Sequence, residues 1–317
     1  MSRRACSLAV SMMLLFLAVA VGSAQEPVSL AFKYAAGDVL EYDVTLTGSG
    51  GLRAPDGQFS PAGIQGNLRL IMTVAEVRPD GTARLQLRIP RGDFQATVAQ
   101  ERANFSFDNG KVRWFANGRE QSPPDADLSQ MPVISVPLEF VAAPTGQIVE
   151  VILPNVPGMA NMQQMIPGLG VPQTQNLGDP IFPEAPVRVG ETWRKYSQVA
   201  PLGPTLPVTV SSSRTLDSVS NEGGIEMARI SGYTEARFRA NSLPLPMGMG
   251  AGEGGMTVGV PDLRHTITST EFFDVGAGRL VRGDYDFSFM TRVSIGMQGE
   301  SQEASVEARL HATVQAR

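Results

Sequence analysis

Period-two alternation of apolar and polar residues is the feature that most constrains this chain. In the first such segment the apolar members fall on one face of an extended strand: Leu40, Tyr42, Val44 and Leu46. Side chains of a strand point alternately to opposite faces, so this pattern predicts a strand with one buried and one solvated face. The apolar members of later segments repeat it: Leu68, Leu70, Met72 and Val74; Leu85, Leu87 and Ile89; Tyr285, Phe287, Phe289, Val293 and Ile295; Val306, Ala308, Leu310, Ala312 and Val314.

Turn residues separate these segments. Pro79-Asp80-Gly81 lies between two of them, and Pro followed by Asp and Gly presets one turn dihedral and supplies a residue that tolerates positive φ. Asp108-Asn109-Gly110 predicts a second hairpin, and Asn117-Gly118 predicts the next reversal. No long stretch has a 3.6-residue period. The fold class expected is therefore mainly β: two related antiparallel units, curved sheets or half-barrels or sandwiches, joined by a short helical or irregular segment.

Composition agrees with a packed β protein. Glycine and proline contribute 33 and 23 of the 317 residues, and they gather between the alternating segments rather than in a low-complexity tract. Such punctuation is typical of loop-rich β domains and not of disorder.

The start of the chain predicts export. Arg3 and Arg4 precede an uncharged apolar run, and Gly22 and Ala24 suit a signal peptidase cutting before Gln25. We expect a signal peptide over 1–24 and a periplasmic or extracellular mature protein; an uncleaved membrane anchor is the alternative reading. The single cysteine, Cys6, precedes the apolar run and so cannot serve as a lipobox acceptor.

The mature chain would therefore lack thiols, which excludes disulfides and thiolate metal sites. Without Arg3 and Arg4, 24 basic residues face 31 acidic ones, a formal charge of −7. Because no dense Lys/Arg run occurs, nucleic acid is not an expected partner.

A weak internal repeat divides the chain. The segment 37–42, Gly-Asp-Val-Leu-Glu-Tyr, resembles 190–196, Gly-Glu-Thr-Trp-Arg-Lys-Tyr, and 107–112 resembles 273–280. This order favours two β units, 25–152 and 185–317, joined by a Pro/Gly/Met-rich connection over 153–184. Chance similarity between short turns is the alternative.

The 153–180 segment is the main candidate binding site. Gly and Pro residues flank an apolar set that could form a flap over a hydrophobic ligand: Val156, Met159, Met162, Met165, Ile166 and Leu169. An ordinary linker between units is the simpler alternative. Copper binding is a minor alternative, because the methionine thioethers of this segment, and of Met247 and Met249 in a second long loop, can coordinate Cu(I). Neither loop contains a histidine that would complete such a site.

Catalytic and metal motifs are absent from the sequence. His265 and His311 are the only histidines, and no Gly-x-Ser-x-Gly elbow or His-rich zinc spacing occurs. Asp284 and Asp286, like Asp125 and Asp127, place two carboxylates on one strand face, but without the ligand loop of a calcium site.

Trp114 and Trp193 are expected as core anchors. We therefore expect no enzyme, no cofactor and no bound metal.

Two short motifs carry a resemblance. Segment 32–42, Phe-Lys-Tyr-Ala-Ala-Gly-Asp-Val-Leu-Glu-Tyr, and segment 186–193, Pro-Val-Arg-Val-Gly-Glu-Thr-Trp, resemble a family of uncharacterised exported bacterial β-rich proteins. Their organisation is loosely similar to that of periplasmic lipoprotein carriers, whose curved antiparallel sheet shelters acyl chains. The resemblance implies an exported, non-catalytic protein that binds a lipid-like ligand. A structural or protein-interaction module of the cell envelope is the alternative.

Overall fold

The structure, a computed structural model, describes residues 26–99, 101–109, 111–116, 118–121, 137–152, 181–199, 208–243, 257–297 and 300–317. Within these residues there is no helix, so none could cross a membrane. The first eight strands are β1 (Val39–Arg53), β2 (Phe59–Val77), β3 (Ala83–Val98), β4 (Glu101–Asp108), β5 (Lys111–Ala116), β6 (Arg119–Gln121), β7 (Leu138–Ala142) and β8 (Ile148–Ile152). The other six are β9 (Thr192–Val199), β10 (Val208–Glu222), β11 (Ile225–Leu243), β12 (Thr257–Asp274), β13 (Arg279–Met297) and β14 (Glu300–Ala316).

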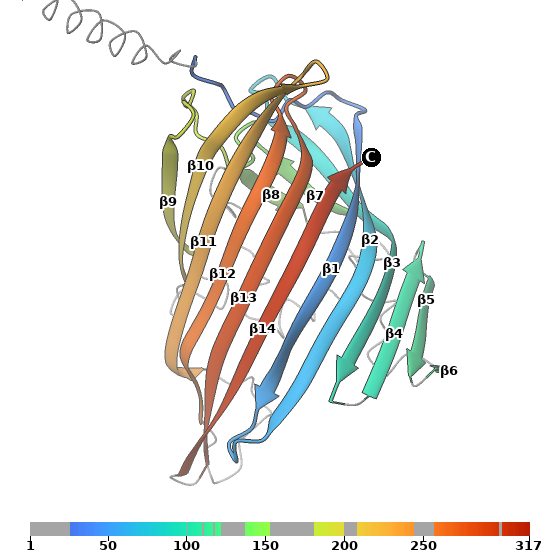
Figure 1. Ribbon diagram of the computed structural model, residues 1–317, viewed down its shortest axis with the longest axis vertical. Helices are drawn as coiled ribbons and strands as arrows, with labels where there is room; N and C mark the ends of the chain where they lie inside the picture. Colours follow the sequence, from blue (N-terminus) through green and yellow to red (C-terminus); the bar gives the residue numbers. More distant parts are fainter. Residues whose placement is uncertain are drawn as a thin grey trace, which may run out of the picture.

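All fourteen strands form one antiparallel sheet that does not close on itself (Figure 1). Its order is β6-β5-β4-β3-β2-β1-β14-β13-β12-β11-β10-β9, so pairing of β1 with β14 joins the two ends of the sequence. Strand β3 pairs with β4 along one part and with β7 along another, and β7 and β8 lie behind the sheet in Figure 1. The expected mainly-β antiparallel fold is confirmed.

The predicted hairpins are present. Gly81 has φ +83°, and the Asp80 carboxylate accepts hydrogen bonds from the Thr82 N–H (2.9 Å) and hydroxyl (2.7 Å). Asn109 has φ +47° between β4 and β5. A second Pro-Asp-Gly turn, at 55–57, connects β1 to β2 and was not singled out from the sequence.

The two Gly-containing motifs of the predicted repeat, at 37–42 and 190–196, make the same pattern of backbone hydrogen bonds. The Gly37 N–H donates a hydrogen bond to the Val74 carbonyl (2.8 Å). The Val74 N–H in turn donates to the carbonyl of Asp38, the residue after the glycine (2.9 Å). Gly190 and Leu216 form the same reciprocal pair, at 2.7 and 3.1 Å. Both glycines have φ near +85°. The division into two units remains a prediction, and the sheet runs continuously through the two proposed units.

The core lies on one face of the sheet, here called the inner face. Its larger cluster packs β10, β11 and β12 against segments 28–32 and 181–187, and its buried members are Leu30, Phe182, Val187, Leu216, Ala228, Ile230 and Phe273. A second cluster packs β2 and β3 against β7 through Val74, Ala83, Leu85 and Ala142.

Phe32 connects the two clusters. Its ring lies 6.0 Å from Tyr34, which packs on the second cluster, and 5.4 Å from Phe273 in the first. The N-terminal segment therefore crosses the inner face at one end of the sheet and seals that end.

Candidate ligand-binding face

Cross-strand register shows which side chains share the inner face. Directly paired residues of antiparallel strands point to the same side, so a row can be followed from strand to strand. One row runs from β9 to β5 through Trp193, Arg214, Gly232, Ser269, Tyr285, Ala312, Leu46, Gly66, Phe94, Phe105 and Trp114. The two tryptophans thus end the same row at opposite sides of the sheet.

Beyond the sealed end, the inner face stays apolar over β12 to β14 but is only partly buried. The next two rows contribute side chains of intermediate exposure: Ile267, Phe287 and Leu310, then His265, Phe289 and Ala308. The His265 ring stacks on Phe287 at 6.1 Å between centroids, which places this histidine in the apolar surface.

Aromatic rings cover glycines at the β2–β5 side. A Cβ added at Gly66 would meet the Phe94 ring at 2.4 Å, so the glycine allows that ring to lie flat on the strand. Phe94 stacks on Phe105 at 4.7 Å, and Phe105 stacks on Trp114 at 6.1 Å. The result is a continuous aromatic surface over three strands.

The β9–β12 side of the inner face carries charge. Arg214 Nη1 donates to the Glu271 carboxylate at 2.5 Å, and their side chains are 20% and 7% exposed. Burial, reinforced by the negative charge of the same Glu271 carboxylate, raises the Tyr285 pKa well above its usual value. Burial raises the pKa of Tyr34 in the same direction.

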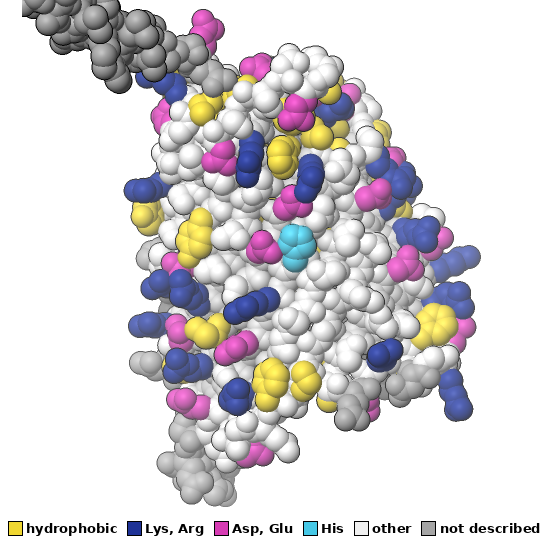
Figure 2. All heavy atoms as spheres, in the orientation of Figure 1, with side chains coloured by type: hydrophobic (Ala, Val, Ile, Leu, Met, Phe, Trp, Pro, Cys, Tyr) yellow, Lys and Arg dark blue, Asp and Glu magenta, His cyan; other side chains and the backbone are white. Residues whose placement is uncertain are grey.

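The opposite, outer face is polar. Figure 2 shows charged side chains scattered over this face, with separate hydrophobic side chains among them. A shallow groove of about 750 Å³ crosses β1 to β5 and is lined mainly by amide and hydroxyl side chains such as Asn67, Gln95 and Asn104. The apolar members of the alternating segments thus lie on the inner face, as predicted. Arg214 on the inner face and exposed Tyr196 on the outer face are exceptions.

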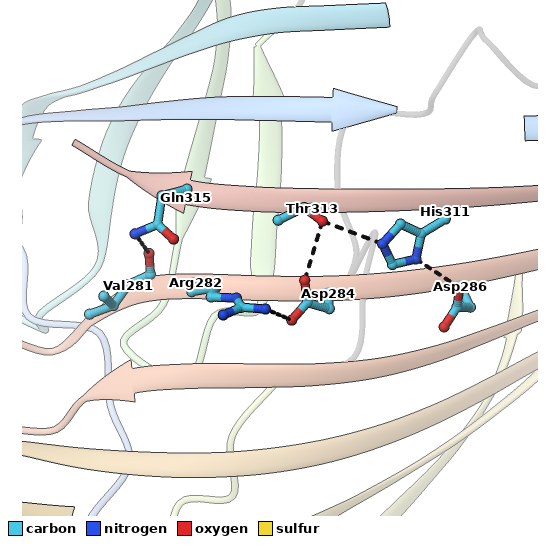
Figure 3. Close-up of polar contacts among 7 residues, drawn as sticks. All are labelled: Val281, Arg282, Asp284, Asp286, His311, Thr313 and Gln315. Carbon is cyan, nitrogen blue, oxygen red and sulfur yellow. Dashed lines mark hydrogen bonds and ion pairs between the residues drawn. The ribbon is translucent and has the colours of Figure 1, made fainter. Parts of the chain in front are cut away.

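A chain of polar contacts runs along the outer face of β13 and β14 (Figure 3). Asp286 Oδ1 lies 2.9 Å from His311 Nδ1, and the other ring nitrogen lies 3.4 Å from the Thr313 hydroxyl. That hydroxyl donates to Asp284 at 3.2 Å, and Arg282 donates to the same carboxylate at 2.8 Å.

This Asp-His-Thr order does not form a hydrolytic site. Thr313 lies near the end of β14, paired with Thr45 on one side and Asp284 on the other. The backbone N–H groups around Thr313 belong to the strand pairing of β14 with β1 and β13. Acyl transfer requires hydrogen-bond donors that stabilise an oxyanion, and this strand pairing does not leave a pair of them free. The predicted sharing of one face by Asp284 and Asp286 is confirmed, and their partners identify a cross-strand polar ladder.

The other sequence candidates divide into those inside and those outside the described residues. Trp193 packs on the larger core cluster and its Nε1 donates to Ile181 O at 3.0 Å, as expected of an anchor. The proposed ligand contacts Val156, Met159, Met162, Met165, Ile166 and Leu169 lie outside the described residues, as do Met247, Met249, Asp125 and Asp127. No group of three metal-ligating His, Cys, Asp or Glu side chains occurs in the described part of the chain.

The sequence analysis did not identify Arg214 and Lys195 as charged residues of the inner face. Arg214 lies two residues before buried Leu216, so it occupies the apolar phase of its strand, and a charge in that phase was the available signal. Lys195 lies two residues after Trp193 in the same phase.

No protein-family model matches the sequence, and no curated protein matches it. Solved structures similar to the chain include Pseudomonas aeruginosa OpdQ, with 6% identity and a TM-score of 0.24 over 88% of this chain and 99% of that one. Pseudomonas aeruginosa OccK7 gives 8% identity and a TM-score of 0.23 over 89% and 99%. An outer membrane channel from Pseudomonas putida F1 gives 6% identity and a TM-score of 0.23 over 93% and 98%.

Proposed function

We propose that this chain is an exported, non-catalytic protein of the cell envelope that binds a lipid-like or other hydrophobic ligand on its inner face. The observation that carries the proposal is the partly exposed apolar surface beyond the sealed end, centred on Phe287 and Leu310. Binding of a ligand that removes this apolar surface from water is favoured by the hydrophobic effect. The signal peptide predicted over 1–24 supports export.

Binding of a neutral fatty alcohol to the mature protein tests this proposal by calorimetry at several temperatures. We expect saturable binding with a negative change in heat capacity, the mark of apolar burial. Leu310→Asp should abolish it, whereas Ser288→Asp, which adds the same charge on the outer face of the neighbouring strand, should not. Absence of binding to the unmodified protein, or equal loss in both variants, would contradict the proposal.

A protein-interaction module is the second candidate, and the edge of the sheet favours it. Strand β9 ends the sheet path and carries Tyr196, whose side chain is 77% exposed on the outer face. Edge strands present backbone groups that can pair with another chain. For such a module, Tyr196→Ser should weaken capture of an envelope partner and leave fatty alcohol binding unchanged.

A further inference from the structure

Along one row of the inner face, the side chains change from apolar to polar. Next to the Trp193 row, the register connects residues that pass from apolar to polar: Leu310, Phe287, Ile267, Thr234, Ser212 and Lys195. Five strand spacings of about 4.8 Å give this row a length of about 24 Å. One leaflet of a bilayer core is about 15 Å deep, so the row is long enough for a single acyl chain and a headgroup.

Two basic residues are diagonal neighbours at the polar end of the row. Lys195 is paired directly with Ser212, two residues before Arg214 on β10, so the two basic residues are diagonal neighbours. Diagonal Cβ atoms lie roughly 7–8 Å apart, within reach of two long side chains. A guanidinium carries five N–H donors, and the hydrogen bond to Glu271 uses one of its nitrogens.

The surroundings favour an anion at this position. Lys195 is partly buried on the inner face, and Arg214 is 20% exposed beside the core cluster. Partial burial reduces the hydration of both cations, so a negative group placed between them is attracted more strongly than at an exposed site. The single carboxylate bonded to Arg214 balances one of the two charges.

We propose that the ligand is a single-chain amphiphile with an anionic headgroup, held by Lys195 and Arg214, with its chain lying over Ile267, Phe287 and Leu310. This inference rests on the proposed hydrophobic-ligand function. The headgroup chemistry is that of a carboxylate or a phosphate monoester, since both accept hydrogen bonds from ammonium and guanidinium groups.

Three probes of equal chain length separate the headgroup from the chain: a fatty acid, an alkyl phosphate and a fatty alcohol, each titrated into the full mature protein. We expect at least one anionic probe to bind about tenfold more tightly than the alcohol, as charge-assisted hydrogen bonds predict. The tighter anion identifies the headgroup.

Variants of strand β9 locate the effect. Lys195→Met should weaken binding of the anion much more than binding of the alcohol, and Lys195→Arg should restore the preference for the anion. Arg194→Met is the matched control, because Arg194 pairs with Ser213 and carries its charge on the outer face of the same strand. This control should keep the preference.

Tryptophan quenching fixes the orientation. In a Trp114→Phe variant, Trp193 is the remaining tryptophan of the chain and is paired directly with Arg214. A fatty acid brominated beside its carboxylate should quench Trp193 more strongly than one brominated at its methyl end.

Equal affinity for anions and alcohol, or an anion preference that survives Lys195→Met, would overturn the headgroup assignment while leaving the hydrophobic site in place. Stronger quenching by the methyl-end bromine would overturn it as well. Failure of all three probes to bind would instead contradict the proposed function.

Discussion

The two ends of the inner face are built by the same strands and the same alternation, yet they differ in what covers them. At the sealed end, Phe273 on β12 is 1% exposed because segments 28–32 and 181–187 pack on it. Further along the paired strand β13, Phe287 keeps an intermediate exposure. Alternation therefore decides which face is apolar, and the segments outside the sheet decide where that face becomes core.

The largest expected effect separates these two phenylalanines. Phe273→Ala should lower the free energy of unfolding by about 4 kcal/mol, since it removes a fully buried ring and leaves a cavity. Phe287→Ala should lower it by about 1 kcal/mol, because that ring is already partly in water. Denaturant unfolding measures both changes, and equal losses would show that the second site is ordinary core.

The next largest effect on the free energy of unfolding concerns the Arg214–Glu271 ion pair, which lies between the two ends of the inner face. Arg214→Met should cost about 3 kcal/mol by leaving the Glu271 carboxylate buried without its ion-pair partner. Arg214→Met combined with Glu271→Leu should recover most of that loss, because no unpaired charge remains. A double variant whose loss equals the sum of the single losses would contradict a coupled pair.

Alkaline pH should weaken the sealed end through its tyrosines. Burial raises the pKa of Tyr34 and of Tyr285 in the folded protein, so their stabilising contribution is complete below the unfolded value of about 10. Above that pH the unfolded state loses protons first, and stability should fall by roughly 1 kcal/mol per group for each pH unit. Unfolding at pH 9 and pH 11 measures the slope, which Tyr34→Phe should reduce; an unchanged slope would contradict this origin.

The smallest effect compares the two equivalent turns. Gly37→Ala and Gly190→Ala should each cost about 1 kcal/mol, because both residues have φ near +85° and neither added Cβ meets an atom within 4 Å. Gly63→Ala is the control, since its φ is not positive and its Cβ would make an ordinary contact at 3.6 Å. Unequal losses at Gly37 and Gly190 would argue that the turns are not equivalent.

Local patterns predicted most of the sheet. Alternation placed Tyr42 and Val44 on the buried face of β1, and Pro79-Asp80-Gly81 located a hairpin, because both signals act over a few residues. Pairing of β1 with β14 joins segments about 270 residues apart, and no local signal specifies it.

The site was less predictable than the fold. Composition predicted a ligand-binding flap over 153–180, which lies outside the described residues. The described apolar surface comes from Phe287, Leu310 and their row partners, whose sequence pattern predicts only regular strands. Lys195 and Arg214 become neighbours through the register of β9 with β10, which the sequence does not encode in any short motif.

Native mass spectrometry of the mature protein, purified from an exporting host, tests the central claim most directly. The account predicts additional mass in the range of a single-chain lipid, lost on mild activation and absent from Leu310→Asp but retained in Ser288→Asp. A bare chain from the same preparation, with no uptake of added fatty alcohol or fatty acid, would contradict a ligand-binding inner face.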